Sequence, residues 1–265
     1  MLTQGGNNMI GKVIVVANNK GGVGKSTSGL VLADVFMKKG KRVLFVDTDP
    51  QANSSATYHA VIDGENTLYD LLEGECTAEE AIQSTDIGDI IASDPSLASV
   101  QMKYTAIPAK LVALKKAIAQ IGKTRDYDYV IIDTAPTLEF YTSMALFAAD
   151  GVLIPVSADL YAIGGLNTIL GFIRQVKEAF NEKLEVYGVF ITAYDQRTAL
   201  GKDCKANLPV KGEELGFHVF EPVRICQDVR NAQAAGMMLL DYAPECNAAA
   251  DYIALAEEIM KRYEQ

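Results

Sequence analysis

The sequence predicts an α/β fold in which a doubly wound, mostly parallel sheet is covered by helices on both faces. Short runs of β-branched and aliphatic residues alternate with longer amphipathic stretches along the chain. These runs are apolar throughout, which is typical of strands that are buried on both faces. No Pro-, Gly- or Ser-rich linker and no internal repeat divides the chain. We therefore expect one domain at residues 12–265, behind an irregular tail at 1–11.

Each expected element rests on its own local pattern. The helix over 25–39 ends at Gly40, and the helix over 108–121 begins with Pro108, where the missing N–H costs nothing. The remaining expected helices are 67–74, 163–180 and 248–265. The expected strands are 12–17, 42–47, 89–93, 127–133, 152–156, 186–192 and 218–223.

Composition excludes several classes of protein. Of the 265 residues, 49% are apolar and 22% are charged, as in an ordinary globular chain that needs no stabilising disulfides. No cysteine pair has CxxC spacing and there are only two histidines, so we expect reduced thiols rather than a zinc or iron–sulfur site. The cysteines are Cys76, Cys204, Cys226 and Cys246.

The chain shows no sign of a membrane or secretory destination. Its first nine residues lack a basic and an apolar region, and no run of 18 apolar residues occurs, so we expect a cytoplasmic protein. The net charge is −10. Affinity for nucleic acid comes from Lys and Arg that neutralise phosphates, so any DNA contact must use a local basic patch.

The strongest functional signal is the segment KGGVGKST at residues 20–27. It follows a strand and opens a helix, which is the context of a phosphate-binding loop. The usual pattern places its first glycine five positions before Gly24, where this chain has Asn19. Glycines let successive N–H groups turn toward phosphate oxygens, and the helix start adds its positive dipole end. The expected nucleotide-binding residues are Gly21, Gly22, Val23, Gly24, Lys25, Ser26 and Thr27, with Lys25 on the β- and γ-phosphates.

Carboxylates follow two other expected strands. Asp47 and Asp49 lie in VDTDPQAN, residues 46–53, and Asp133 ends the apolar run YDYVIID. The carboxyl ends of parallel strands form the edge where α/β proteins bind ligands. The alternative reading of the first pair is an Asp-rich turn closed by Pro50. Of the nearby side chains, the Ser26 hydroxyl is the one that we expect to serve a Mg²⁺ ion.

Together these segments resemble the deviant Walker A superfamily of ParA, MinD and the nitrogenase iron protein, over about residues 12–262. The resemblance implies the P-loop NTPase fold and Mg²⁺-dependent ATP hydrolysis. It implies that Lys20 reaches across a dimer interface to the partner's nucleotide, and that Asp49 positions the attacking water. Asp47 and Asp133 match residues that support Mg²⁺ through water. Ala135 stands where the family usually has proline, which puts the stiffness of that segment in doubt.

The later motifs are weaker. Residues 221–236 resemble the family's segment near the adenine, although Glu221 replaces the usual isoleucine, and Pro222 and Val223 are the candidate adenine contacts. The [NT]KxD motif that reads guanine does not occur in the sequence, which favours ATP over GTP.

Within the superfamily, the DNA-partitioning branch fits best. The cysteines do not suit the iron–sulfur branches, the ending EEIMKRYEQ does not resemble MinD's basic membrane helix, and only Tyr263 lies near the end where another branch is Tyr-rich. The segments TLYDLLEG and ITAYDQRT are similar to partitioning proteins of the short type without an N-terminal helix-turn-helix. The resemblance implies an ATP-bound homodimer, non-specific DNA binding that places the protein on the nucleoid, a ParB-type centromere-binding partner and no membrane contact.

Two other functions stay open at this level. A MinD-like or other ParA-like ATPase would position a protein complex rather than DNA, which the acidic net charge favours. A P-loop enzyme acting on a small molecule would need a substrate-binding insertion, and none is visible. The candidate DNA-binding residues, which are equally well explained as solvated surface charges, are Arg197, Lys202, Lys205, Lys211, Arg224 and Arg230.

Overall fold

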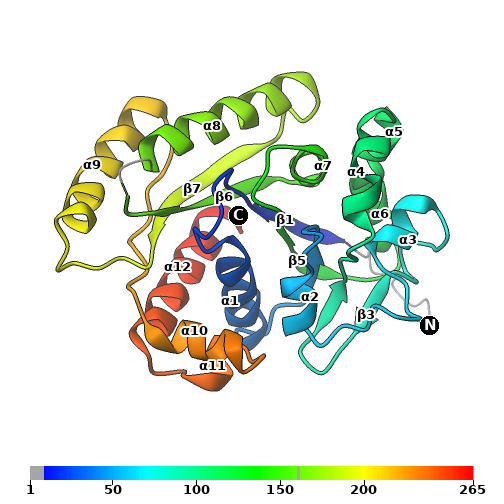
Figure 1. The fold of residues 1–265 in the computed structure, drawn as a ribbon, viewed down its shortest axis with the longest axis horizontal. Coiled ribbons are helices and arrows are strands. Elements are labelled where there is room, and N and C mark those ends of the chain that lie inside the picture. The colour runs from blue at the N-terminus through cyan, green and yellow to red at the C-terminus, as the bar shows by residue number, and fades with distance from the viewer. Residues whose placement is uncertain (1–8, 160–161, 265) are drawn as a thin grey trace, which may run out of the picture.

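The computed structural model describes residues 9–159 and 162–264, and it contains a sheet in the order β3-β4-β2-β5-β1-β6-β7. Neighbouring strands are parallel except for the β3–β4 pair, which is antiparallel. The fold is therefore the expected doubly wound, mostly parallel α/β architecture (Figure 1). The strands are β1 (Ile10–Val16), β2 (Val43–Asp47), β3 (Ile82–Ser84), β4 (Asp89–Ile91), β5 (Tyr127–Asp133), β6 (Gly151–Ser157) and β7 (Glu185–Thr192).

Helices cover both faces of this sheet (Figure 1). One face packs against α1 (Lys25–Lys38), α10 (Gln227–Ala234), α11 (Leu239–Tyr242) and α12 (Asn247–Tyr263). The other packs against α3 (Leu68–Glu73), α4 (Leu97–Thr105), α5 (Pro108–Leu111), α6 (Ala113–Ile121), α7 (Phe140–Ala148), α8 (Ala162–Ala179) and α9 (Ala199–Leu215). The short α2 (Asn53–Thr57) follows β2.

The continuous apolar character of the strands has the expected cause. Along β1, Val13 and Val15 belong to the core under α6–α8, whereas Ile14 and Val16 belong to the core under α1 and α12. Because successive side chains point to opposite faces, a strand with a core on each side must be apolar at every position.

The expected strand at 218–223 is wrong. This segment makes one isolated bridge, Val189 to Val219, a second bridge, Tyr194 to Arg224, follows it directly, and the segment does not join the sheet. Phe220 N donates to Val189 O at 2.9 Å, and Val223 N donates to Ile191 O at 2.8 Å. Pro222 between them has no N–H to donate, so the ladder is interrupted there.

Other boundaries differ from the expectation by smaller amounts. The helix expected over 108–121 is split at Val112 into α5 and α6, and the antiparallel edge strand β3 was not anticipated. β1 begins at Ile10, two residues before the expected domain start, and residues 1–8 of the expected tail lie outside the described residues. The other expected elements agree with the structure within about two residues at each end.

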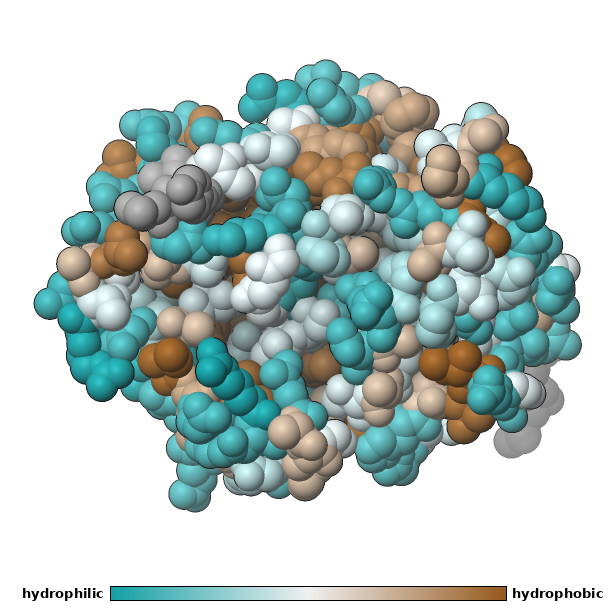
Figure 2. Space-filling model, in the orientation of Figure 1, coloured by the Kyte–Doolittle hydropathy of each residue, from teal (hydrophilic) through white to brown (hydrophobic). Residues whose placement is uncertain are grey.

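The part of the chain that the structure describes contains no helix with the length and apolar character needed to span a membrane. The face drawn in Figure 2 is mostly hydrophilic, and its apolar residues form small separate groups.

Candidate functional site

The carboxyl ends of β1, β2 and β5 meet at one edge of the sheet and bring the three main motifs together. Val16 and Asp47 are both register partners of Asp133, so the end of β5 lies between the ends of β1 and β2. The loop after β1 leads through residues 20–24 into α1. The motifs expected at this edge, which are separated by up to about a hundred residues in the chain, therefore form one site.

The loop at 20–24 has the backbone conformation that its glycines permit. Gly22 and Gly24 adopt φ values of 71° and 81°, in the left-handed region that disfavours residues with a Cβ. Gly24 is the N-cap of α1 and supplies no side-chain cap. The first turn of a helix carries N–H groups without intrahelical partners, so this end of α1 is suited to an anion.

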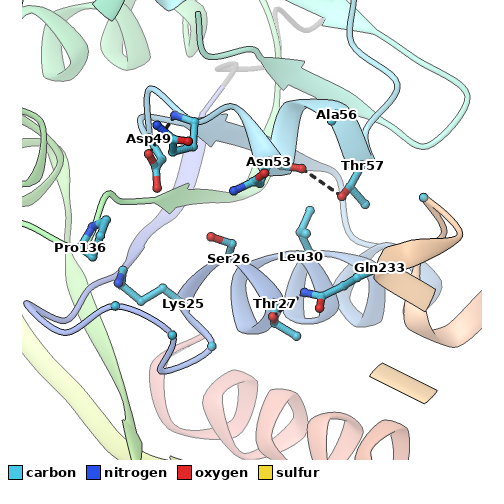
Figure 3. A pocket seen from close by; sticks show the side chains of 15 residues that line it. Lys25, Ser26, Thr27, Leu30, Asp49, Asn53, Ala56, Thr57, Pro136 and Gln233 are labelled. Carbon is cyan, nitrogen blue, oxygen red and sulfur yellow. Dashed lines mark hydrogen bonds between the residues drawn. The ribbon is translucent and has the colours of Figure 1, made fainter. Parts of the chain in front are cut away.

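Lys25 places a cation inside this loop. Its side chain is buried, and its Nζ donates to the backbone oxygen of Lys20 at 2.9 Å. In Figure 3 the side chain extends toward Pro136 and Asp49 across the pocket. Burial lowers the pKa of Lys25, and the negative charges of Asp133 and Asp49 oppose that shift. A partly desolvated ammonium group gains strongly from an anionic ligand that replaces its lost hydration.

Asp47 and Asp133 form a fully buried pair of carboxyl groups. Ser55 donates to Asp47 through both its N and its Oγ, each at 2.8 Å, and Ser54 Oγ donates to Asp133 at 2.8 Å. Burial raises the pKa of both carboxyl groups, and the charge of Asp133 raises that of Asp47 further. The charge of Lys25 opposes the raised pKa of Asp133 only in part, and a bound metal ion would add further compensating charge.

The donors at this edge fit Mg²⁺. The Ser26 hydroxyl lies beside Asp133 and lowers the pKa of that carboxyl group by hydrogen bonding. Hydroxyl and carboxylate oxygens, with water, are the ligands that Mg²⁺ takes in phosphate-binding sites. The structure brings Ser26, Asp47 and Asp133 together at this edge, and their role as the metal site stays a prediction.

A pocket of about 630 Å³ opens over the loop and the helix start. We call its two ends the phosphate side and the distal side. The phosphate side is lined by Gly21, Gly22, Gly24, Lys25, Ser26, Thr27, Asp49, Gln51 and Pro136. The distal side is lined by Leu30, Asn53, Ala56, Thr57, Gln233 and Gly236. The volume is in the range of small-molecule sites.

The distal side includes residues that sequence reasoning missed. Gln233 Nε2 donates to Thr27 Oγ1 at 2.7 Å, and Gln233 faces Thr27 in Figure 3. Pro222 and Val223, the expected adenine contacts, do not line the pocket, and Val223 packs in the core. Gln233 and Gly236 both belong to the segment 221–236, so this segment reaches the pocket through residues other than the two expected.

Two further expected residues have distinct positions. Val23 is buried, and its carbonyl oxygen accepts from Thr192 Oγ1 at 2.8 Å, which holds the loop against β7. Lys20 does not line the pocket. Its Nζ forms an ion pair with Asp159 and donates to Ser157 Oγ at 3.4 Å, at the end of β6. The two lysines of the motif therefore point to different surroundings.

The candidate DNA-binding residues lie on α9, on α10 and in the loops before them. Arg197 pairs with Asp195 at 2.8 Å, Lys205 with Glu221 at 2.8 Å and Arg224 with Asp251 at 2.7 Å, and Lys211 pairs with Glu214. Within the described residues, Lys202 and Arg230 have no carboxylate within ion-pair distance. Residues 195–230 contain six Lys or Arg and six Asp or Glu, so the segment is neutral in a chain of net charge −10.

Comparison with known proteins identifies relatives along nearly the whole chain. A family model described as an AAA domain matches residues 11–186. The chain is 36% identical over 254 residues to the chromosome-partitioning ATPase Soj of Thermus thermophilus, and this alignment covers 95% of this chain and 96% of that protein. It is 33% identical over 260 residues to the chromosome partitioning protein ParA of Caulobacter vibrioides, which covers 95% of this chain and 94% of the relative.

A solved structure shares the fold. Cobyrinic acid a,c-diamide synthase from Mycobacterium smegmatis, with bound ATP analogue and magnesium, matches with a TM-score of 0.81 and 26% identity over 96% of each chain.

Proposed function

Because this chain belongs to the ParA/Soj-type ATPases of the AAA domain family, we propose that it partitions DNA by an ATP-dependent cycle of dimerisation and DNA binding. The observation that supports the proposal is the phosphate side of the pocket, which is lined by Lys25 and adjoins the buried pair Asp47 and Asp133 at the strand ends. ATP and Mg²⁺ are the cofactors that this donor set fits.

In this proposal the phosphates of ATP lie in the loop at residues 20–27, and the adenine occupies the distal side of the pocket. The N–H groups of the loop and Lys25 hold the phosphates, while Ser26, Asp47 and Asp133 hold the ion directly or through water. Bound Mg²⁺ would neutralise charge on the β- and γ-phosphates. Asp49, which lines the pocket opposite Lys25, orients the attacking water.

Lys20 links hydrolysis to dimerisation. In the single chain its amine is held by Asp159, outside the pocket. In the dimer it would exchange this carboxylate for the phosphates of the partner's nucleotide, where a second cation stabilises the charge that develops during phosphoryl transfer. A chain without its partner therefore hydrolyses ATP poorly.

Two substitutions separate these roles. We expect Lys20→Ala to keep measurable ATP binding but to lose dimerisation and hydrolysis, and Asp49→Ala to trap an ATP-bound dimer with hydrolysis reduced by about 100-fold or more. Light scattering with ATP measures the dimer, and phosphate release measures hydrolysis. ATP-driven dimerisation of Lys20→Ala would refute the proposal that Lys20 leaves Asp159 for the phosphates of the partner's nucleotide. Normal turnover by Asp49→Ala would refute the water-orienting role of Asp49.

The dimer would bind DNA without sequence preference, and a ParB-type partner would stimulate hydrolysis and release it. The decisive experiment is a gel shift with unrelated duplexes at low salt, with ATP, with ADP and without nucleotide. We expect binding only with ATP, and loss of binding as salt rises, because phosphate contacts release counterions. Absence of binding in every state, alongside normal ATP-driven dimerisation, would favour the alternative ATPase that positions a protein complex.

Matched charge reversals locate the DNA surface. We expect Arg197→Glu with Arg230→Glu to weaken binding by about tenfold or more, since each removes a phosphate contact and adds repulsion. The control variant is chosen in residues 97–125, a basic segment outside the candidate residues that contains six Lys or Arg and no Asp or Glu. Lys115→Glu with Lys116→Glu, both exposed on α6, should have the smaller effect. The opposite ranking would move the DNA surface to α6.

A small-molecule enzyme is the remaining candidate, favoured by the structural similarity to the M. smegmatis synthase. ATP consumption that depends on a small carboxylic acid and an ammonia donor, and that yields the amide of that acid, would support it over partitioning.

A further inference from the structure

Two cysteines that lie 20 positions apart in the chain meet at the starts of two helices. Cys226 is the N-cap residue of α10, and Cys246 is the N-cap residue of α12. Asp228 lies in the first turn of α10. The two sulfur atoms and one carboxylate oxygen all lie within 4.8 Å of one another. Figure 1 shows α10 and α12 adjacent on the same face of the sheet.

The spacing of these atoms suits a tetrahedral metal ion. Zinc binds sulfur at about 2.3 Å and carboxylate oxygen at about 2.0–2.2 Å, so two such ligands of one ion lie roughly 3.5 Å apart. The observed distance from Cys226 Sγ to the Asp228 carboxylate is 3.6 Å. All three residues are half-buried, so solvent can reach the cluster and supply a fourth ligand as water.

The surroundings of the cluster favour thiolate once a cation is present. The backbone N–H of Ala249 donates to Cys246 Sγ at 3.3 Å, and both sulfurs lie at the positive ends of helix dipoles. Burial raises the pKa of the Cys246 thiol, and the charge of a bound cation would oppose this shift. Binding of one Zn²⁺ to two thiols and one carboxylate would release two protons to solvent.

We propose that Cys226, Asp228 and Cys246 form a binding site for one zinc ion that fastens the start of α10 to the start of α12. The segment between the two cysteines carries Gln233 and Gly236, which line the distal side of the nucleotide pocket. A metal ion bound by both cysteines would hold the two ends of this segment together. The site is thus a structural clamp outside the ATP and Mg²⁺ chemistry.

Asp228 distinguishes this site from a simple dithiol. A disulfide between Cys226 and Cys246 would need the sulfurs at about 2.05 Å from each other and would not bind the Asp228 carboxylate. Both cysteines are free thiols in the structure. A third ligand at coordination distance is what a borderline-soft cation requires and what a disulfide does not.

The test uses the untagged full-length protein, reduced with a phosphine that does not bind zinc. The protein is loaded with zinc, dialysed and assayed for metal by atomic absorption, and Co²⁺ serves as a spectroscopic substitute. We expect one zinc per chain and, with Co²⁺, a thiolate charge-transfer band together with the visible bands of a tetrahedral ion. Cys226→Ser with Cys246→Ser should abolish both signals, and Asp228→Asn should lower zinc affinity by about tenfold or more.

The matched control is Cys76→Ser with Cys204→Ser, because these half-buried cysteines lie outside the cluster. This variant should keep the metal. Zinc should also raise the Tm of the wild type but not that of the Cys226/Cys246 variant, because a ligand stabilises only the state that binds it. Equal zinc content in wild type and that variant, Co²⁺ binding without a thiolate band, or a Cys226–Cys246 disulfide that persists in place of metal would each overturn the proposal.

Discussion

The phosphate side of the nucleotide pocket contains the buried Lys25 and adjoins the buried carboxyl groups at the ends of β2 and β5, whereas the distal side carries no charged side chain and is formed by residues of α1, α2, α10 and the loop at Gly236. Lys25 and Asp133 are nearly or fully buried, but Gln233 is exposed. Buried charges lose much more free energy than exposed amides when a partner is removed. Most of the free energy of ATP binding should therefore come from the phosphate side, and changes on the distal side should alter the ATP affinity by smaller amounts.

The largest expected effect concerns Lys25. We expect Lys25→Ala to weaken ATP binding by about 100-fold, because hydrogen bonds to charged groups contribute about 1.5–3 kcal/mol each and the ammonium makes more than one. Isothermal titration with ATP and Mg²⁺ measures this loss. Lys20→Ala is the matched control, since Lys20 belongs to the same loop but lies outside the pocket. Equal losses in the two variants would contradict the distinction between the lysines.

The distal side should respond more weakly. We expect Gln233→Ala to lower ATP affinity by about threefold, because it removes one neutral hydrogen bond, to Thr27. Pro222→Ala is expected to leave the affinity unchanged, since Pro222 does not line the pocket. Titration of both variants under the same conditions checks the order. A larger loss for Pro222→Ala would restore the adenine contact expected from the sequence.

The smallest effect is a pH dependence at the distal side. His59 Nδ1 lies 3.0 Å from Asp86 Oδ1, and Nε2 lies 3.1 Å from Gly236 O. Both partners accept, so both ring nitrogens must carry protons, and the pKa of His59 is raised by Asp86 first and by Gly236 second. A raised pKa in the folded state adds stability that is complete below about pH 6.5 and is lost as the pH rises through the folded value.

Thermal unfolding at pH 6 and pH 8 tests this sign. The wild type should lose more stability over the interval than His59→Gln, and the difference should stay below about 1 kcal/mol because the pair is largely exposed. Identical pH profiles would show that the bond to Gly236 does not depend on the imidazolium form.

Much of the phosphate side could be predicted because its groups are encoded in contiguous segments. The run from Lys20 to Thr27 specifies its own turn through Gly22 and Gly24, whose positive φ values suit glycine. Asp47 and Asp133 follow apolar runs that read plainly as strands, and parallel strands bring their carboxyl ends to one edge. Local sequence thus determined these positions before any packing was known.

Tertiary structure decided the remainder. The partner of Lys20 is Asp159, 139 residues away, and no local pattern links the two. The extended segment at 218–223 resembles a strand by composition, but whether it joins the sheet depends on its neighbour β7 and on Pro222, which cannot donate a hydrogen bond. Gln233 reaches the pocket only because α10 packs near the start of α1.

The cysteines show the same division. Spacing along the chain gave no sign of a metal site, since Cys226 and Cys246 are 20 positions apart, yet the fold brings the starts of α10 and α12 together and with them both sulfurs and Asp228. The sequence by itself determined the fold class, the phosphate loop and the family. The tertiary structure decided which distant side chains meet, because such contacts depend on how helices pack on the sheet and not on the residues beside them in the chain.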